Sequence, residues 1–148
     1  MSHRPPDDRH YRKLERAYAN APINEYFEPR LTIGPGTAEL VIPVQKKFFH
    51  AGGAIHGSIY FKALDDAAFF AAQSVVLEVF VLTVSFNLYF LRPVVSGTLT
   101  ANARLTFRSR RLFVAEAVLL DERNREVAQG SGTFMRSQIR LDGLVGYE

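Results

Sequence analysis

The chain has 148 residues, of which 47% are hydrophobic and 22% are charged, and its formal net charge is +3 at pH 7. This length fits one domain, and this composition excludes a wholly disordered chain. The chain has no cysteine, which excludes a disulfide scaffold, a cysteine nucleophile and a thiolate metal site. The small excess of basic residues gives no reason to expect nucleic acid as a partner.

The start of the chain predicts a tail and one short helix. Residues 1–9 contain two prolines and two aspartates, so we expect a loose tail. A helix is predicted over His10–Asn20, with Asp7 or Asp8 as its N-cap and a solvated histidine at its first position. Three prolines then predict an irregular connection over residues 24–35.

The middle of the chain predicts a strand, a glycine-rich turn and a long helix. Thr37–Val44 is rich in β-branched residues and is expected to be a strand. The turn covers residues 50–58 and contains three glycines. A helix of about five turns is predicted over residues 59–77, with Ser58 as its N-cap. Apolar side chains lie on nearly all its sides, which is typical of a buried helix.

Four strand patterns with short connections follow, and short connections favour antiparallel neighbours. The fold class is therefore α+β, with one antiparallel sheet wrapped around one helix. Because one helix covers only one face of the sheet, we expect a second copy to pair with it. No segment has the pattern of a membrane span or a targeting signal, so we expect a cytoplasmic protein without a membrane partner. The four predicted strands are Leu82–Leu91, Thr98–Arg108, Arg111–Asp121 and Glu126–Gln138.

Two adjacent carboxylates, Asp65 and Asp66, stand out in the apolar helix. Burying a carboxylate is costly unless it is paired or has a function. Lys62 lies three residues before one and four before the other, so it has the spacing to pair with either. One interpretation is that both carboxylates are solvated or ion-paired. The other is that one of them acts as a general base or nucleophile.

The glycine-rich turn precedes the helix and carries His50, His56 and Gly57. Backbone amides at a helix start carry partial positive charge and stabilise a developing oxyanion. We therefore expect Gly57 and Asp65 to line one pocket, although a plain tight turn explains the glycines equally well. A metal site is not expected, because the two histidines are six residues apart in a turn.

A cluster of arginines surrounds the predicted hairpin that follows the second of the four strands. Guanidinium groups suit phosphates, but a solvated hairpin explains them as well. Neither a phosphate-binding loop nor a G-x-S-x-G nucleophile turn occurs in the chain. The cluster consists of Arg104, Arg108, Arg110 and Arg111.

Five segments together resemble the hotdog-fold acyl-CoA thioesterases of the phenylacetate-pathway and 4-hydroxybenzoyl-CoA type. The resemblance implies a long central helix wrapped by an antiparallel sheet. It also implies homodimers, often paired into homotetramers, with each active site at a subunit interface. We expect this domain to span residues 37–140, between an N-terminal tail with a short helix and a C-terminal tail at 141–148. The segments are H-A-G-G-A-I-H-G-S at 50–58, L-D-D-A at 64–67, F-L-R-P at 90–93, S-R-R-L at 109–112 and V-A-Q-G-S-G-T-F at 127–134.

The resemblance implies roles for five catalytic positions. The family's carboxylate lies nine residues after the histidine of its H-G-G motif. Here that histidine is His56 and the carboxylate is Asp65. The resemblance makes the amide of Gly57 the oxyanion donor. It makes His50 a positioning group for the carbonyl or the water. It also implies that Thr83 reaches the site from the partner subunit.

The resemblance further implies how the substrate is bound, without a metal or cofactor. Arg110 and Arg111, helped by Arg108, match the basic residues that meet the phosphates of CoA. Ser58 replaces the second glycine of the H-G-G motif, so it either changes the close approach of the ligand or caps the helix. Phe61, Phe69 and Phe70 belong either to the core or to the wall of an acyl pocket.

The expected function is hydrolysis of acyl-CoA thioesters to the free acid and CoA. Three alternatives remain open at this point. One is a non-catalytic domain that binds or senses acyl-CoA, which would not need Asp65. Another is a hotdog dehydratase of acyl-ACP, whose acid follows the turn glycine more closely than Asp65 does. The third is a purely structural dimer.

Overall fold

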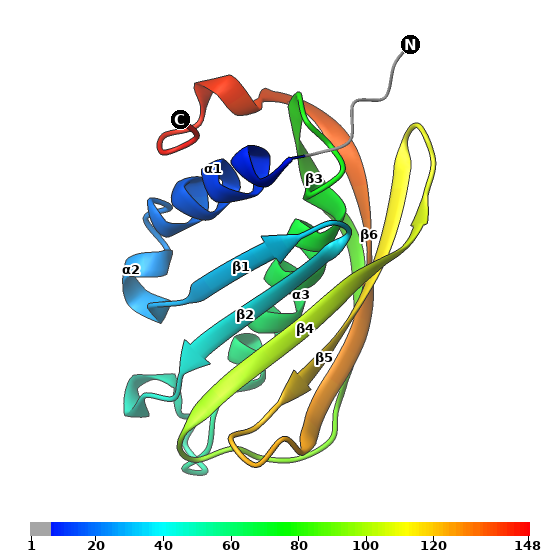
Figure 1. Ribbon diagram of the computed structural model, residues 1–148. Coiled ribbons are helices and arrows are strands. Elements are labelled where there is room, and N and C mark those ends of the chain that lie inside the picture. Colours follow the sequence, from blue (N-terminus) through cyan, green and yellow to red (C-terminus); the bar gives the residue numbers. More distant parts are fainter. Residues whose placement is uncertain (1–6) are drawn as a thin grey trace.

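The structure is a computed structural model that describes residues 7–148. One antiparallel sheet of six strands curves around a single long helix, α3 (Figure 1). This confirms the predicted α+β architecture. The strand order across the sheet is β1-β2-β4-β5-β6-β3, so β1 and β3 are the two edges. The strands are β1 (Arg30–Gly34), β2 (Thr37–Pro43), β3 (Val79–Phe90), β4 (Thr98–Arg108), β5 (Leu112–Leu120) and β6 (Glu126–Arg140).

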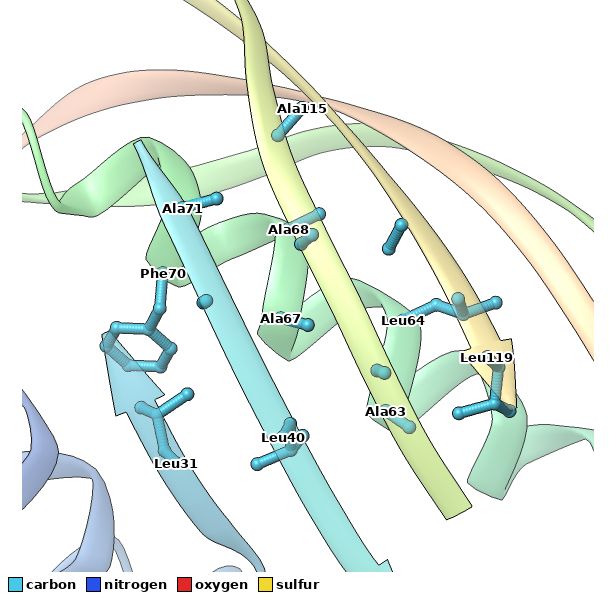
Figure 2. Close-up of a cluster of buried hydrophobic side chains, with 14 of the residues drawn as sticks. Leu31, Leu40, Ala63, Leu64, Ala67, Ala68, Phe70, Ala71, Ala115 and Leu119 are labelled. Atoms are coloured by element: carbon cyan, nitrogen blue, oxygen red, sulfur yellow. The ribbon is translucent and has the colours of Figure 1, made fainter. Parts of the chain in front are cut away.

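Helix α3 (Gly57–Gln73) lies in the concave face of the sheet and presents alanines to it. Figure 2 shows Ala63, Ala67 and Ala71 on the side of α3 that faces the strands. The facing strands also carry small side chains, including Ala101 and Ala115, which are fully buried. Small residues on both surfaces allow the helix axis to approach the sheet closely at native packing density. This close packing makes α3 the centre of the core.

Alternating hydrophobic patterns predicted the later strands well, and β4 has the predicted bounds. The long helix is shorter than expected, because it ends at Gln73 rather than at residue 77. Gln73 is buried, its side-chain amide donates to the carbonyls of Val76 and Val79, and its side-chain carbonyl accepts from the amide of Val81. These bonds satisfy the backbone of the turn between α3 and β3, so the chain leaves the helix there.

The N-terminal region contains more regular structure than the sequence indicated. Helix α1 (Asp8–Ala19) is capped by Asp7, as predicted, but begins two residues earlier than expected. The predicted connection over residues 24–35 is wrong, because it contains a short helix, α2 (Asn24–Phe27), and strand β1. The sheet thus begins at Arg30, before the boundary expected at residue 37. Prolines misled the prediction because they flank β1 rather than interrupt it.

The C-terminal residues pack against α1. After the one-turn 3-10 helix η2 (Leu141–Gly143), the chain returns across α1, as Figure 1 shows. His10 is buried, and its Nδ1 lies 2.9 Å from the hydroxyl of Tyr147. The expectation of a solvated histidine is therefore wrong. Arg16 donates to the carbonyl of Glu148, so both ends of the described chain are joined by polar contacts.

The edge strand β3 has no charged side chain along its twelve residues. Edge strands that remain unpaired in solution commonly carry charges or prolines that prevent pairing with another chain. Leu82, Val84 and Tyr89 of β3 are instead large, apolar or aromatic, and exposed. Within residues 7–148, no helix is long and apolar enough to cross a membrane.

Candidate active site

The N-terminus of α3 is built from the H-G-S sequence. The N-cap is His56 rather than the predicted Ser58, because the backbone of His56 is extended and Gly57 is already helical. The Nδ1 atom of His56 accepts from the Ser58 amide at 3.0 Å and lies 2.8 Å from the Ser58 hydroxyl. The amide of Gly57 has no intrahelical acceptor, because it is the first residue of the helix. This amide therefore points out of the N-terminal end of the helix, which is the positive pole of the helix dipole.

Gly57 also lies under an aromatic ring. A Cβ atom placed on Gly57 would stand 3.0 Å from the ring of Phe90. The same ring has its centroid 5.8 Å from that of Tyr60, whose hydroxyl donates to the carbonyl of Arg92. The F-L-R-P segment is thereby fixed against the start of α3. Glycine allows the helix end to lie directly against the ring, and a larger residue would make the ring shift by a few tenths of an ångström.

Asp66 is an ion-paired residue that joins α3 to the N-terminal helices. Lys62 Nζ lies 2.7 Å from the Asp66 carboxylate and donates to Asn24 at 2.8 Å. The hydroxyl of Tyr18, in α1, donates to the other side of the same group. Lys62 thus pairs with Asp66, and no cation of residues 7–148 forms an ion pair with Asp65. The interpretation in which both carboxylates are ion-paired is excluded.

Among the described residues, the Asp65 carboxylate has one hydrogen-bond partner, a hydroxyl on the neighbouring strand. Thr83 in β3 donates to Asp65 Oδ1 at 2.9 Å. Burial raises the pKa of Asp65 to about 6, while the Thr83 hydrogen bond opposes that rise and the charge of Asp66 adds to it. Thr83 and the Asp65 that it contacts belong to the same chain. At neutral pH Asp65 is ionised and more basic than an ordinary aspartate.

Two pairs of aromatic rings, each joining α3 to β3, flank Asp65 along the helix. Phe61 lies one helical turn before Asp65 and meets Phe86 edge-on, with ring centroids 5.7 Å apart. Phe69 lies one turn after Asp65 and meets Phe80, with ring centroids 4.9 Å apart. These apolar neighbours explain the desolvation of the carboxylate. They make Asp65 a polar group between two apolar pairs of side chains.

The ring of Phe86 rests on two glycines of β6. A Cβ atom on Gly130 or Gly132 would lie 2.7 or 2.6 Å from this ring. Both distances are shorter than real contacts, so the G-S-G sequence of β6 makes room for Phe86. In the sequence, these glycines had no assigned role beyond the segment V-A-Q-G-S-G-T-F to which they belong. Their spacing of two residues was the signal that a large side chain covers one face of that strand.

Gly57 and Asp65 of one chain lie too far apart to act on one carbonyl group. They are eight residues apart on the same helix, and a rise of about 1.5 Å per residue separates them by about 12 Å. A reacting carbonyl needs its oxyanion donor and its base within about 3 Å. The expectation that both line one pocket is therefore not met within a single chain.

His50 lies in the turn that precedes α3 and contacts its own loop. Its Nδ1 accepts from the Gly52 amide at 2.9 Å, and its ring is exposed. The loop is held to the helix start by the bond from the His56 amide to the Phe48 carbonyl. His50 is thus at the Gly57 end of α3 and makes no hydrogen bond with Asp65. Across residues 7–148, no three His, Asp or Glu side chains are grouped so that they could hold a metal ion.

The arginines lie at the opposite end of the sheet from Gly57. Arg108, Arg110 and Arg111 are exposed at the hairpin between β4 and β5 (Figure 1). Strand β4 is 11 residues long, and at about 3.3 Å per residue it separates this hairpin from the Gly57 end by about 30 Å. The sequence did not single out Arg136 of β6, which donates to the carbonyl of Arg110 at 2.9 Å and adds a fourth guanidinium there. Arg104 is instead paired with Glu116.

Comparison with known proteins places this geometry in a family. The model of the Thioesterase superfamily matches residues 52–128, more than half of the chain. The chain belongs to the thioesterase superfamily. A protein of Sulfurisphaera tokodaii named "Putative esterase" is 30% identical over 98 residues, which cover 66% of this chain and 72% of that protein. The match to the family model begins within the turn, includes α3, β3, β4 and β5, and ends within β6.

Solved structures of the superfamily share the fold. A thioesterase family protein from Silicibacter pomeroyi has a TM-score of 0.79 and 30% sequence identity, over 85% of this chain and 96% of that chain. The PaaI protein of the phenylacetic acid degradation operon of E. coli has a TM-score of 0.82 and 19% identity, over 91% and 98%. The second likeness concerns the fold alone. Together they confirm the hotdog fold that the sequence motifs implied.

Replacing Asp65 by an uncharged residue should stabilise the folded protein at neutral pH. An unfolded aspartate has a pKa near 3.8 and folded Asp65 one of about 6. The folded state binds more protons between these values, so the free energy of unfolding falls as the pH rises through this window. We expect Asp65→Asn to gain about 1–3 kcal/mol at pH 7 and almost nothing at pH 4. Urea denaturation of both proteins at the two pH values measures this, and a gain independent of pH would contradict it.

Proposed function

We propose that this chain hydrolyses acyl-CoA thioesters to the free acid and CoA, with Asp65 as the general base or nucleophile. The observation that carries the proposal is the unpaired Asp65 carboxylate between two aromatic pairs, with its pKa raised to about 6. A base of this strength is ionised at neutral pH and still accepts a proton effectively. Membership of the thioesterase superfamily supports the reaction class. The exposed arginine hairpin supports acyl-CoA as the substrate, since guanidinium groups bind phosphates.

In the proposed dimer, a second copy of the chain pairs along β3, so that Gly57 of one copy lies near Asp65 of the other. An antiparallel two-fold pair across this edge brings the Phe90 end of one β3 next to the Val79 end of the other. Gly57 of one copy, which contacts Phe90, then approaches Asp65 and Thr83 of its partner. Thr83 thus comes from the subunit that supplies Asp65. The absence of charged side chains from the edge strand β3, and its exposed Leu82 and Val84, support this pairing.

The same pairing brings the arginine hairpin to the site. Arg136 pairs with Val81 near the start of β3 and binds the hairpin through Arg110. In an antiparallel pair, the start of β3 in one copy lies beside the Gly57 end of the other. Arg110 and Arg111, with Arg108, then face the partner's oxyanion site from the side where the phosphates of CoA would lie. We therefore propose a homodimer, or a homotetramer built from such dimers, with two composite active sites in each dimer.

The reaction follows from these groups. The thioester carbonyl oxygen points to the Gly57 amide at the helix start, where negative charge develops. Asp65 takes a proton from a water molecule whose oxygen attacks the carbonyl carbon, or its own oxygen attacks to form an anhydride that water then cleaves. The C–S bond breaks, and the CoA thiolate leaves and takes up a proton. His56 fixes the helix end by capping it, and His50 and Ser58 are polar groups beside it that orient the carbonyl or the water.

The direct test is the release of free thiol from a panel of acyl-CoA esters by the wild type and by Asp65→Asn. We expect wild-type turnover with kcat/KM rising as the pH increases through about 6, because Asp65 must be ionised. The variant should lose turnover by at least about 10³-fold, while it keeps its fold and binds the esters. Binding without thiol release by the wild type would favour an acyl-CoA sensor instead.

The oxyanion donor can be removed without changing the helix. Gly57 is the first helical residue and His56 is extended, and both conformations suit a proline at position 57. Gly57→Pro deletes the amide hydrogen, so kcat should fall by about 10²–10³-fold. Gly57→Ala is the matched control, because it places a Cβ against Phe90 but keeps the amide. Equal losses in both variants would show that the contact with Phe90 matters, not the donor.

Mixing two inactive variants tests whether the site is shared. Asp65→Asn and Gly57→Pro are each inactive as pure dimers under the proposal. A mixed dimer has one site with both defects and one with none, so an equal mixture refolded together should recover about a quarter of wild-type activity. Subunit exchange followed by thiol-release assays measures this. If each site lay within one chain, the mixture would recover nothing.

A further inference from the structure

We infer that the cavity between α1, α3 and the C-terminal residues is the binding pocket for the acyl group, which takes an apolar tail at least as large as a benzene ring. This rests on the proposed function, because the acyl group must begin at a carbonyl beside Asp65. The cavity has a volume of about 250 Å³. Its walls include Leu14, Ala17, Tyr18, Phe70, Phe80 and Val145.

The cavity adjoins the aromatic pair that follows Asp65 along α3. Phe80 belongs both to the wall of the cavity and to the pair with Phe69, whose centroid lies 4.9 Å away. Phe69 is one helical turn beyond Asp65, or about 5.4 Å along α3. A thioester whose carbonyl is held at Asp65 can therefore extend its tail past Phe69 and Phe80 into the cavity. No charged residue in the described part of the chain lines the cavity.

The hydroxyl of Tyr18 marks the boundary between the polar and apolar parts. Its ring forms one wall and meets Phe70 edge-on, with centroids 5.0 Å apart. Its hydroxyl is directed out of the cavity to the Asp66 carboxylate. The ion pair of Asp66 with Lys62 is thereby kept on the far side of the ring. The cavity therefore offers mainly apolar surface to a ligand, and Asn20 is the polar side chain in its lining besides the Tyr18 hydroxyl.

The wall formed by the C-terminal residues is held in place rather than open. Tyr147 is bound by His10 at 2.9 Å and lies under Lys13 Nζ, which is 5.2 Å from the ring centroid. Gly146 adopts a φ of +90°, and a Cβ atom there would lie 2.8 Å from the Arg16 carbonyl. Val145, beside this anchor, is thus held over the cavity. An apolar cavity of about 150 Å³ already holds benzene, so this larger one has room for a larger tail.

Two substitutions on α1 test the pocket. Ala17→Phe fills the cavity, whereas Ala19→Phe places the same ring on the exposed face of the same helix as a matched control. The assay measures kcat/KM for unbranched acyl-CoA esters from acetyl to decanoyl and for an aromatic ester. We expect Ala17→Phe to lose at least about tenfold on octanoyl and longer esters and to stay within about twofold on acetyl-CoA. The control should keep the wild-type profile, and the aromatic ester shows whether rings or chains suit the pocket better.

A smaller substitution covers the case in which Ala17→Phe does not fold. Ala17→Leu should show the same trend with a smaller loss on the longest esters. An unchanged profile in the folded Ala17 variants would overturn the pocket, even if Asp65-dependent hydrolysis is intact. If the wild type hydrolyses no ester, the proposed function fails, and calorimetric titration with octanoate then decides the pocket. At least tenfold tighter binding to the wild type and Ala19→Phe than to an Ala17 variant would support it, and equal affinities would overturn it.

Discussion

The packing of an alanine-rich helix face into a curved sheet is the constraint on which the rest of this structure depends. Ala63, Ala67 and Ala71 allow α3 to lie close to strands that also carry small buried residues. The helix is then surrounded on most sides, so ten of its 17 residues are buried. Any polar group on α3 must consequently be paired with another group or remain in an apolar environment at a cost in free energy.

The two carboxylates of α3 show both outcomes. Asp66 is satisfied by Lys62 and Tyr18, and it joins the N-terminal helices to the core. Within residues 7–148, the Asp65 carboxylate has only the hydroxyl of Thr83 as a hydrogen-bond partner, and burial raises the pKa of Asp65 to about 6. Such a carboxylate costs stability, and sites of this kind are typical of function rather than of structural support. The ion pair of one aspartate thus leaves the other available for chemistry.

The segments at the two ends of the described chain, α1 and residues 141–148, both cover part of α3. Helix α1 and residues 141–148 are tied together through His10 and Tyr147, and they cover the C-terminal half of α3. The opposite half of α3 starts at Gly57, under the ring of Phe90. In the proposed dimer, one end of the helix supplies the oxyanion donor and the middle supplies the base for the neighbouring site. The far end bounds the inferred pocket.

Local patterns determined the elements that depend on short-range rules. Strict alternation defined β4, and the continuous apolar run defined α3 as a buried helix, because both signals come from neighbours along the chain. The same rules failed for β1, since a five-residue strand between prolines is recognisable only through its pairing with β2. They also failed for the cap of α3, where a histidine rather than Ser58 accepts the amide hydrogen.

For the site, the sequence by itself determined which residue types are present and in what order, and the family resemblance pointed to Asp65. Only the tertiary structure decided that Lys62 pairs with Asp66, because its spacing from both aspartates was compatible with pairing. Tertiary structure alone also placed Tyr18 and Phe80, from distant parts of the chain, around one cavity. Long-range packing sets these positions, and no local pattern encodes it. The separation of Gly57 and Asp65 along one rigid helix is also a feature of the tertiary structure. In the proposed dimer, a second copy of the chain brings the two groups together.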